Sequence, residues 1–293
     1  MSGSPPDAGL VVVDKPGGLT SHDVVARVRR LAGTRKVGHA GTLDPMATGV
    51  LVVGVGRATR LLGHLTLTVK AYDATVRLGA ATTTDDAEGD LLERSPTTGL
   101  DADAVVAAAR AFVGDIAQRP SSVSAVKVDG RRSYARVRAG ELVELPERPV
   151  TVHELTVRDV RREGDWLDAD LTVRCSSGTY VRALARDLGG SLGVGGHLTR
   201  LRRTAVGPFT LAEAHRLEDL AAGVRVLDLG VVARRCFPAV DLDEDAARAV
   251  RHGRPLPLAL EHAGPVALVG PEGGFLALYE RRGEGAAPVA VFV

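Results

Sequence analysis

The chain has 293 residues, of which 45% are hydrophobic and 25% charged, and these are the proportions of a folded globular protein. This composition excludes disorder along the whole length, and no stretch approaches the roughly 20 uncharged apolar residues of a membrane-spanning helix. The N-terminal residues lack a basic start, so we expect no secretory signal. Cys175 and Cys236 cannot make a disulfide framework, and we therefore expect a cytoplasmic protein without a membrane partner.

The net charge of +1 hides an uneven distribution of charge along the chain. Residues 1–70 hold nine Lys or Arg against four Asp, and residues 174–216 hold seven Arg against two acids. Residues 71–118 hold three Arg against nine acids. The two basic segments are typical of surfaces that meet phosphate, although charge solvated along helices would give the same count.

The first 80 residues are predicted to alternate buried strands with a helix. Thr20, followed three residues later by Asp23, indicates a capping box at a helix start, and Gly33 ends the helix. Apolar runs and alternating patterns predict strands at residues 9–14, 50–55 and 67–78.

Further elements are predicted beyond an acidic loop at residues 82–90. Asp101 is expected to cap a helix that ends at Gly114. The Pro-, Ser-, Gly- and Arg-rich stretch at 118–149 is expected to be a long mobile loop. Residues 167–175 alternate like a strand, and a helix over 179–188 is expected to stop at the glycines that follow it. Strands and helices without regular βαβ spacing predict an α+β fold.

The composition and the hydrophobic pattern of the sequence change near residue 238. A short acidic helix is expected at 241–252, and the remaining residues read as short strands separated by Gly and Pro. We therefore divide the chain into a large domain at 1–237 and a small β-rich domain at 238–293.

One segment, RKVGHAGTLDPMATGVL at residues 35–51, is typical of a functional turn. Its glycines and Pro45 predict a sharply folded connection between a helix and a buried strand. Asp44 precedes the proline, which pushes it out of the helical region, and apolar Leu43 and Met46 flank it. Its carboxylate is either presented into a pocket or used to start an Asp-Pro turn.

The whole segment resembles the catalytic motif of the TruB family of tRNA pseudouridine synthases, whose catalytic residue is the aspartate of GHxGxLDPxAxGVL. Four more segments resemble that family in order, so the resemblance covers most of residues 9–210: VDKPGGLTSHD at 13–23, KAYDATVRLG at 70–79, CSSGTYVRALARDLG at 175–189 and HLTRLRRTAVGPF at 197–209. The chain departs from the family at Val123, where a tyrosine is usual, and at Thr83 and Asp85 in the acidic loop. The resemblance implies a mixed, mainly antiparallel sheet with flanking helices. It makes 1–237 the catalytic domain, with 118–149 as its RNA-binding loop, and 238–293 a PUA-like RNA-binding domain.

The resemblance implies that the protein isomerises uridine 55 in the TΨC loop of tRNA to pseudouridine by base flipping. The expected partner is the T arm and loop of tRNA, and the protein is expected to act as a monomer with no obligate protein partner. No cofactor and no metal are expected, since the sequence lacks a Walker phosphate loop, an EF-hand loop and a zinc-site spacing.

The resemblance also assigns site residues. Asp44 is the expected catalytic residue, and three roles stay open for it: attack on the ribose, attack on the base, or abstraction of a ribose proton. The expected substrate-binding residues are His39, Tyr72, Tyr180, Arg182, Leu201 and Lys15. Phosphate contacts are expected from basic residues near both ends of this region: Arg27, Arg29, Arg30, Arg35, Lys36, Arg200, Arg202 and Arg203.

Arg182 is expected to pair with Asp44 and keep it charged. Tyr72 is expected to stack on the flipped uracil, and Leu201 to close an apolar wall. His39 is expected to fill the space that the base leaves, and Lys15 to support the turn or bind a phosphate.

Two other functions remain open at this stage. A tRNA-folding chaperone would need the same basic surfaces and the same flipping residues. A glycoside hydrolase would need a second carboxyl about 5 to 10 Å from the first, and Asp86 in the acidic loop is the candidate for it.

Overall fold

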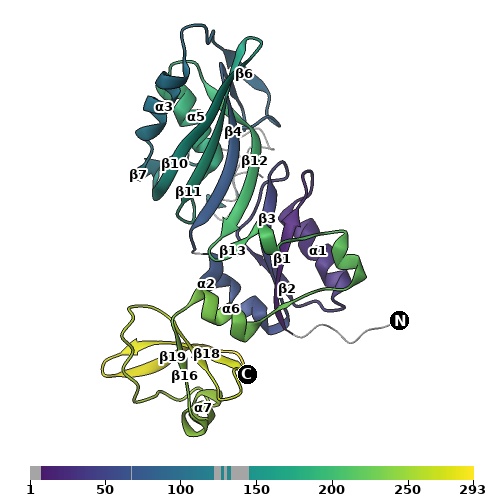
Figure 1. Cartoon of the computed structure of the whole chain (residues 1–293), viewed down its shortest axis with the longest axis vertical. Coiled ribbons are helices and arrows are strands. Elements are labelled where there is room, and N and C mark those ends of the chain that lie inside the picture. The colour runs from purple at the N-terminus through teal and green to yellow at the C-terminus, as the bar shows by residue number, and fades with distance from the viewer. Residues whose placement is uncertain (1–7, 67, 122–126, 129–130, 133–144) are drawn as a thin grey trace. The chain divides into compact units, whose positions relative to one another are not determined.

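The structure is a computed structural model that describes residues 8–66, 68–121, 127–128, 131–132 and 145–293. The chain divides into two compact units, drawn in Figure 1. Unit 1 comprises Met1–Pro45, Gly49–Thr66 and Gly207–Val293, and unit 2 comprises Met46–Thr48 and Leu67–Val206. Among the described residues, no helix is long and apolar enough to cross a membrane.

Unit 1 is built on the antiparallel pair β1 (Gly9–Lys15) and β3 (Thr48–Val55), whose valine-rich runs are buried on both faces. Three shorter strands extend this pair: β2 (Val37–Ala40) beside β3, and β14 (His215–Arg216) and β15 (Leu227–Asp228) beside β1. Its other elements are η1 (Gly56–Arg60), α2 (Leu62–Thr66), β13 (Phe209–Thr210), η2 (Leu211–Glu213), η3 (Asp219–Ala222) and α6 (Leu229–Cys236).

Helix α1 (Ser21–Leu31) begins as the sequence predicts, with a capping box between Thr20 and Asp23. The Asp23 carboxylate accepts from the Thr20 amide at 2.8 Å, and the Asp23 amide donates to the Thr20 hydroxyl at 3.1 Å. The helix buries Val24, Val25 and Val28 against the β1–β3 core. The N-terminal prediction is therefore confirmed in both its start and its buried face.

The C-terminal residues of unit 1 form a separate four-stranded sheet in the order β16-β17-β18-β19. Its elements are β16 (Ala239–Asp241), α7 (Glu244–Arg251), β17 (Val266–Val269), β18 (Phe275–Arg282) and β19 (Gly285–Val291). They enclose their own core, in which Leu268, Ala277 and Tyr279 are buried. This confirms the predicted β-rich C-terminal part, while its boundary at residue 238 stays a prediction.

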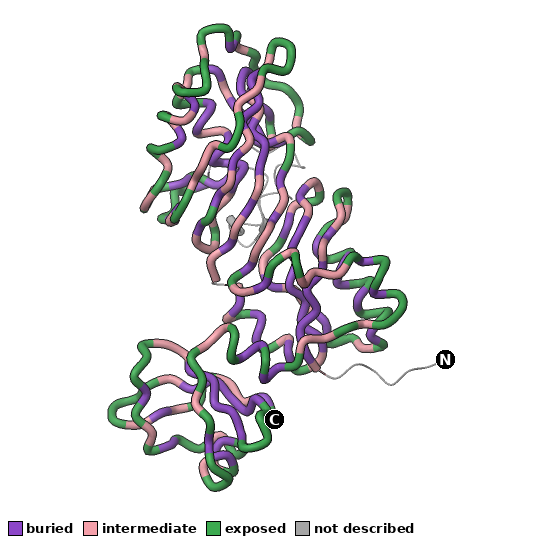
Figure 2. Tube along the Cα trace, viewed as in Figure 1, coloured by how far each residue is buried: buried purple, intermediate pink, exposed green. Residues whose placement is uncertain are grey.

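Unit 2 contains an antiparallel sheet in the order β12-β4-β11-β10-β7, with buried residues along its strands (Figure 2). Helix α5 packs on β12 and β4, and α3 packs on β10. The bounds are β4 (Lys70–Leu78), β5 (Ala80–Thr82), β6 (Leu91–Arg94), α3 (Ala102–Arg110), β7 (Gly114–Gln118), β8 (Lys127–Val128), β9 (Arg131–Arg132), β10 (Arg148–Glu163), β11 (Trp166–Cys175), α5 (Val181–Ser191) and β12 (Gly196–Val206).

The prediction that glycines end the helix after residue 188 is wrong. Helix α5 continues through Gly189 and Gly190 to Ser191. A Cβ at Gly189 would lie 2.2 Å from the backbone of Gly195 and Gly196. The glycine therefore allows the helix to touch the start of β12, and it does not act as a stop signal.

Two other stretches differ from the prediction. Helix α3 ends at Arg110, and Gly114 begins strand β7, which the sequence does not predict. Strand β10 begins at Arg148, within the stretch predicted as a loop over 118–149. Its pairing with β11 is interrupted by register shifts near Glu154 and Asp159, which disturb the alternation that marks a strand. The mobility expected for the rest of that stretch falls mostly outside the described residues.

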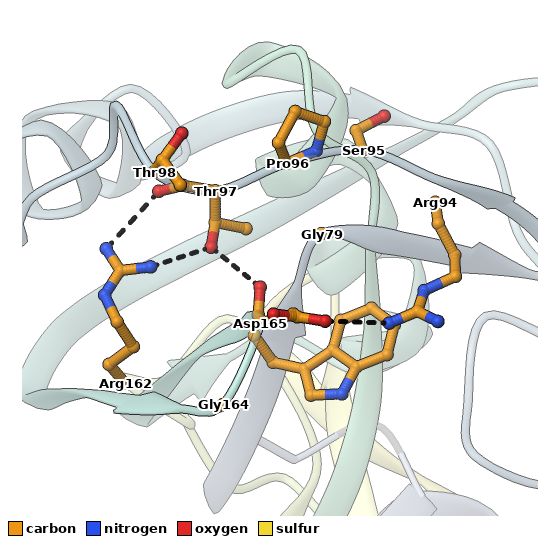
Figure 3. A pocket seen from close by; sticks show the side chains of 10 residues that line it. Gly79, Arg94, Ser95, Pro96, Thr97, Thr98, Arg162, Gly164 and Asp165 are labelled. Carbon is orange, nitrogen blue, oxygen red and sulfur yellow. Dashed lines mark hydrogen bonds and ion pairs between the residues drawn. The ribbon is translucent and has the colours of Figure 1, made fainter.

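A cavity of about 560 Å³ lies where the residues after β6 meet the β10–β11 turn in unit 2 (Figure 3). Arg162 donates to the Thr97 hydroxyl at 3.1 Å and to its carbonyl at 3.4 Å. The Arg94 guanidinium lies 4.3 Å from the centre of the Trp166 ring. These groups fasten the connection after β6 to the sheet, and the cavity includes none of the predicted site residues.

An ion pair joins two elements of unit 1 near the start of the C-terminal sheet. The Arg235 guanidinium donates to both carboxylate oxygens of Glu213 at 2.7 Å and to the Pro208 carbonyl at 2.7 Å. It also lies 4.8 Å from the centre of the Phe209 ring. The pKa of the Glu213 carboxyl is below its ordinary value of 4.5, chiefly because Arg235 hydrogen-bonds to it.

Glu213→Gln is expected to lower the free energy of unfolding by about 1 kcal/mol at pH 7, after allowance for the partial exposure of both side chains. A depressed folded-state pKa means that this stabilisation is present above the unfolded value of 4.5 and is lost as the pH falls through the folded value. Urea unfolding of both proteins at pH 7 and about pH 3 measures the difference. Glu284→Gln, at an exposed turn, is the control, and a Glu213→Gln effect that stays constant with pH would contradict the assignment.

Candidate active site

The turn between β2 and β3 carries Asp44 and is fixed to helix α1 on its N-terminal side. The buried Ser21 hydroxyl accepts a hydrogen bond from the Leu43 amide at 2.9 Å and donates to the Leu43 carbonyl at 3.2 Å. Gly41 has a φ of +81°, a value that glycine adopts freely. Leu43 therefore has both backbone groups satisfied by one side chain, immediately before Asp44.

The C-terminal side of the same turn is fixed by a buried lysine. Lys15 ends β1 with 0% of its surface exposed, and its ammonium donates to the carbonyls of Pro16, Leu19 and Pro45 at 2.9, 2.6 and 3.2 Å. The Gly18 amide also donates to the Pro45 carbonyl, at 2.9 Å. Of the two roles expected for Lys15, this geometry favours support of the turn over phosphate binding.

His39 lies on strand β2 opposite Val53, within the segment 35–51 that the sequence predicts as a sharply folded connection, so the turn itself is shorter than predicted. Its ring meets the ring of His22 edge-to-face, with centroids 5.4 Å apart and planes at 88°. Unit 1 therefore holds three of the predicted site residues, together with the first turn of α1: Lys15, His39 and Asp44. Asp44 is half-buried.

Tyr72 and Leu201 lie on neighbouring strands of unit 2. Leu201 on β12 faces Ala74 on β4, two residues along from Tyr72, so both side chains point to the same face of the sheet. Tyr72 is 7% exposed and Leu201 6% exposed. The predicted stacking ring and the predicted apolar wall are therefore diagonal neighbours on one surface.

Arg203 is buried opposite Tyr72, with 1% of its surface exposed. The prediction that Arg203 contacts phosphate at the surface is therefore wrong. Arg202 is partly buried. The other basic residues predicted to contact phosphate are exposed: Arg27, Arg29, Arg30, Arg35, Lys36 and Arg200.

The start of helix α5 is held by a side chain from β7. The buried Gln118 amide donates to the Tyr180 carbonyl at 3.1 Å and accepts from the Tyr180 amide at 2.8 Å. Tyr180 is the N-cap residue of α5 and has no side-chain cap, so this pair of bonds fixes the direction in which the helix begins.

Arg182 makes a buried ion pair in the first turn of α5. Its Nε lies 3.5 Å from Oδ2 of Asp86, and each side chain is 4% exposed. Its Nη1 also donates to the Thr84 carbonyl at 2.8 Å. The predicted pairing of Arg182 with Asp44 stays a prediction, since those residues belong to different units.

Asp86 is predicted from the sequence only as the acid or base of a hydrolase, and its role as partner of Arg182 is a finding of the structure. The two residues lie 96 positions apart, and no local spacing links them. The sequence could have indicated this pair in one way: an arginine that is buried is normally paired with a carboxylate, and the acidic loop contains several.

Comparisons with known proteins agree with the motifs. A family model described as "TruB family pseudouridylate synthase (N terminal domain)" matches residues 29–181, about half of the chain. Models of the C-terminal domains of tRNA pseudouridine synthase II and of tRNA pseudouridylate synthase B match residues 237–293 and 182–232. The chain belongs to the TruB family of pseudouridylate synthases.

Curated relatives in this family are similar over almost their whole length. A protein of Thermobifida fusca named tRNA pseudouridine synthase B is 60% identical, with 97% of this chain and 98% of that protein covered. The protein of the same name from Arthrobacter sp. is 55% identical over 97% and 96%. The TruB resemblance and the assignment to an isomerase are thereby confirmed.

Solved structures confirm the fold. The chain is similar to a protein in the crystal structure of a Cbf5-Nop10-Gar1 complex, with a TM-score of 0.74, 28% identity, and coverage of 97% of this chain and 85% of that one. A structure of an H/ACA RNP bound to a substrate RNA gives a TM-score of 0.73 at 27% identity, with the same coverage. The predicted TruB-type α+β architecture is therefore correct.

Ser21→Ala removes both hydrogen bonds to Leu43 and releases one side of the Asp44 turn. We expect the free energy of unfolding to fall by about 1–3 kcal/mol and pseudouridine formation to fall more than tenfold, since displacement of a reacting group is costly. Ser191→Ala is the matched control, because among the residues that the structure describes its hydroxyl donates only to the Leu188 carbonyl at the end of α5. If the two variants lost activity equally, Ser21 would not position Asp44.

Proposed function

We propose that this member of the TruB family converts uridine 55 in the TΨC loop of tRNA to pseudouridine, with Asp44 as the catalytic residue. The observation that carries the proposal is the turn at 43–45. A half-buried carboxylate stands between two residues whose backbones are fixed by buried side chains, Ser21 and Lys15. That tRNA is the substrate is supported by the relatives named tRNA pseudouridine synthase B.

The reaction breaks the bond from ribose C1′ to uracil N1 and forms a bond from C1′ to C5. The proton on C5 is lost and N1 gains one, so the nucleotide keeps its composition and needs no oxidant or reductant. Asp44 attacks the ribose, attacks the base, or removes a ribose proton, and together these roles require a carboxylate held beside the ribose and the base. Water must be excluded while the base is detached, because water that reacted at ribose C1′ in place of the base would leave uracil free.

The remaining site residues serve the extruded base. Flipping costs a few kcal/mol, and stacking on an aromatic ring offsets about 1–3 kcal/mol of it. Tyr72 supplies the ring, Leu201 on the same face of the sheet supplies the apolar wall, and Tyr180 lines the pocket. His39 fills the space that the base leaves, and the Arg182 guanidinium pairs with the Asp44 carboxylate.

The substrate is held by exposed cations. Arg27 and Arg30 are exposed on α1, and Arg35 and Lys36 follow it, so one segment of unit 1 offers several phosphate contacts. The domain at 238–293 serves as a PUA-like RNA-binding module. The protein acts on the T arm as a monomer without an obligate protein partner, in the cytoplasm where tRNA is found.

Asp44→Asn is expected to reduce pseudouridine formation on unmodified tRNA at least about 1,000-fold, because the amide cannot act as nucleophile or base. The affinity for tRNA is expected to stay within about threefold, since the change removes one charge and no cation. Mapping of pseudouridine and filter binding measure the two quantities.

Asp165→Asn is the matched control, since that carboxylate is 91% exposed at the β10–β11 turn. Pseudouridine formation at the normal rate by Asp44→Asn would overturn the assignment. Free uracil as the product would favour a hydrolase. Absence of pseudouridine with the wild-type protein, together with accelerated tRNA folding, would favour a chaperone.

A further inference from the structure

Two arginines one turn apart on α5 hold three consecutive residues of the acidic loop. Arg182 binds the Thr84 carbonyl and the Asp86 carboxylate, and Arg186 binds the Asp85 carboxylate at 3.1 Å. Side chains four residues apart on a helix lie on the same face. The loop is therefore attached to α5 with Asp85 directed to one arginine and its two neighbours to the other.

This arrangement depends on an unusual backbone conformation at Asp85. Its φ is +60°, and no other non-glycine residue that the structure describes has a positive φ. Residues with a Cβ disfavour this region, although Asp tolerates it better than most. The conformation reverses the chain between Thr84 and Asp86, so that both can reach Arg182 while Asp85 points to Arg186.

Strand β12 fixes the loop from a second direction. The Leu198 amide donates to the Asp85 carbonyl at 3.0 Å, and the Ala87 amide donates to the Leu198 carbonyl at 2.8 Å. The Thr82 hydroxyl donates to the Asp86 carbonyl at 2.7 Å. These bonds hold the backbone around Asp85, but only Arg186 among the described side chains pairs with its carboxylate.

Arg186 uses each of its guanidinium nitrogens. Besides Asp85, its Nη2 donates to the Arg119 carbonyl at 2.8 Å and its Nε to the Asp187 carboxylate at 2.8 Å. Asp187 is its neighbour on α5, and Arg119 follows β7 directly. These two hydrogen bonds fix the guanidinium of Arg186 independently of Asp85. A group that imposes a conformation on its partner must be held in this way.

We infer that Arg186 is a positioning residue for the pseudouridylation site. It holds Asp85 in the left-handed conformation, and this places the Asp86 carboxylate against Arg182. Arg186 itself touches no substrate. The inference rests on the proposed function, in which Arg182 serves the active site.

The test uses a glycine to separate positioning from other roles. Arg186→Ala is expected to lower kcat about 10- to 100-fold with KM and tRNA affinity changed less than about threefold, since no phosphate contact is lost. Glycine adopts a positive φ freely, so Asp85→Gly keeps the loop conformation without help. The double variant Asp85→Gly/Arg186→Ala is therefore expected to recover kcat to within about threefold of Asp85→Gly alone, a non-additive result.

Arg161→Ala is the matched control, because Arg161 is also a partly exposed arginine of unit 2 with a carboxylate partner, Asp170 at 2.6 Å. It is expected to leave kcat unchanged. Arg186→Gln keeps the polar character and most of the length of the side chain but removes its charge, and it should lower kcat in the same way if the alanine variant does not fold.

Three results would overturn the inference: unchanged kcat in Arg186→Ala, no recovery in the double variant, or a loss that appears in tRNA affinity. Failure of the proposed function would be distinct, since the wild-type protein would then make no pseudouridine.

Discussion

A buried ammonium group holds together the segments that carry the candidate catalytic residue. Lys15 is wholly inside unit 1, and a charge removed from water is tolerated only where its donors find acceptors. Carbonyls on both sides of the group meet this need, two from the loop after β1 and one from Pro45. The loop after β1 and the turn before β3 therefore cannot move apart without leaving a buried cation unsatisfied. Asp44 lies on the turn so constrained.

Unit 2 uses the same principle, except that one of the acceptors of a buried cation is itself charged. There one of the buried cations is Arg182, and its acceptors include a carbonyl and a carboxylate from the acidic loop. The excess of acids in residues 71–118 is thus not only a solvated surface, because part of it neutralises α5. The glycine contact of α5 with β12 brings the helix close enough to the sheet for the loop to be bound from both sides.

The sequence was most informative where structure is local. The capping box at Thr20, the buried runs of β1 and β3, and the alternation of β4 all depend on neighbours within a few residues, and each was predicted correctly. The long strand β10 was missed because its register shifts disturb the alternation, and the glycines of α5 were misinterpreted because their reason lies on another strand. In the candidate site, the motif identified Asp44 and Arg182. The anchors Ser21 and Asp86 could not be predicted, since each meets its partner only through the tertiary fold.

These anchors are better explained by geometry than by stability. Replacing a buried ion pair with apolar groups of similar size is often neutral or stabilising, so stability alone does not explain why unit 2 has the pair of Arg182 and Asp86. An apolar contact, however, has no preferred direction, and a loop held by it can slide. Hydrogen bonds at 2.8 Å from a guanidinium to a carbonyl fix distance and direction together. An enzyme that detaches a base and rejoins it through another atom needs such fixed groups, because the sugar and the base must stay in place between the two steps.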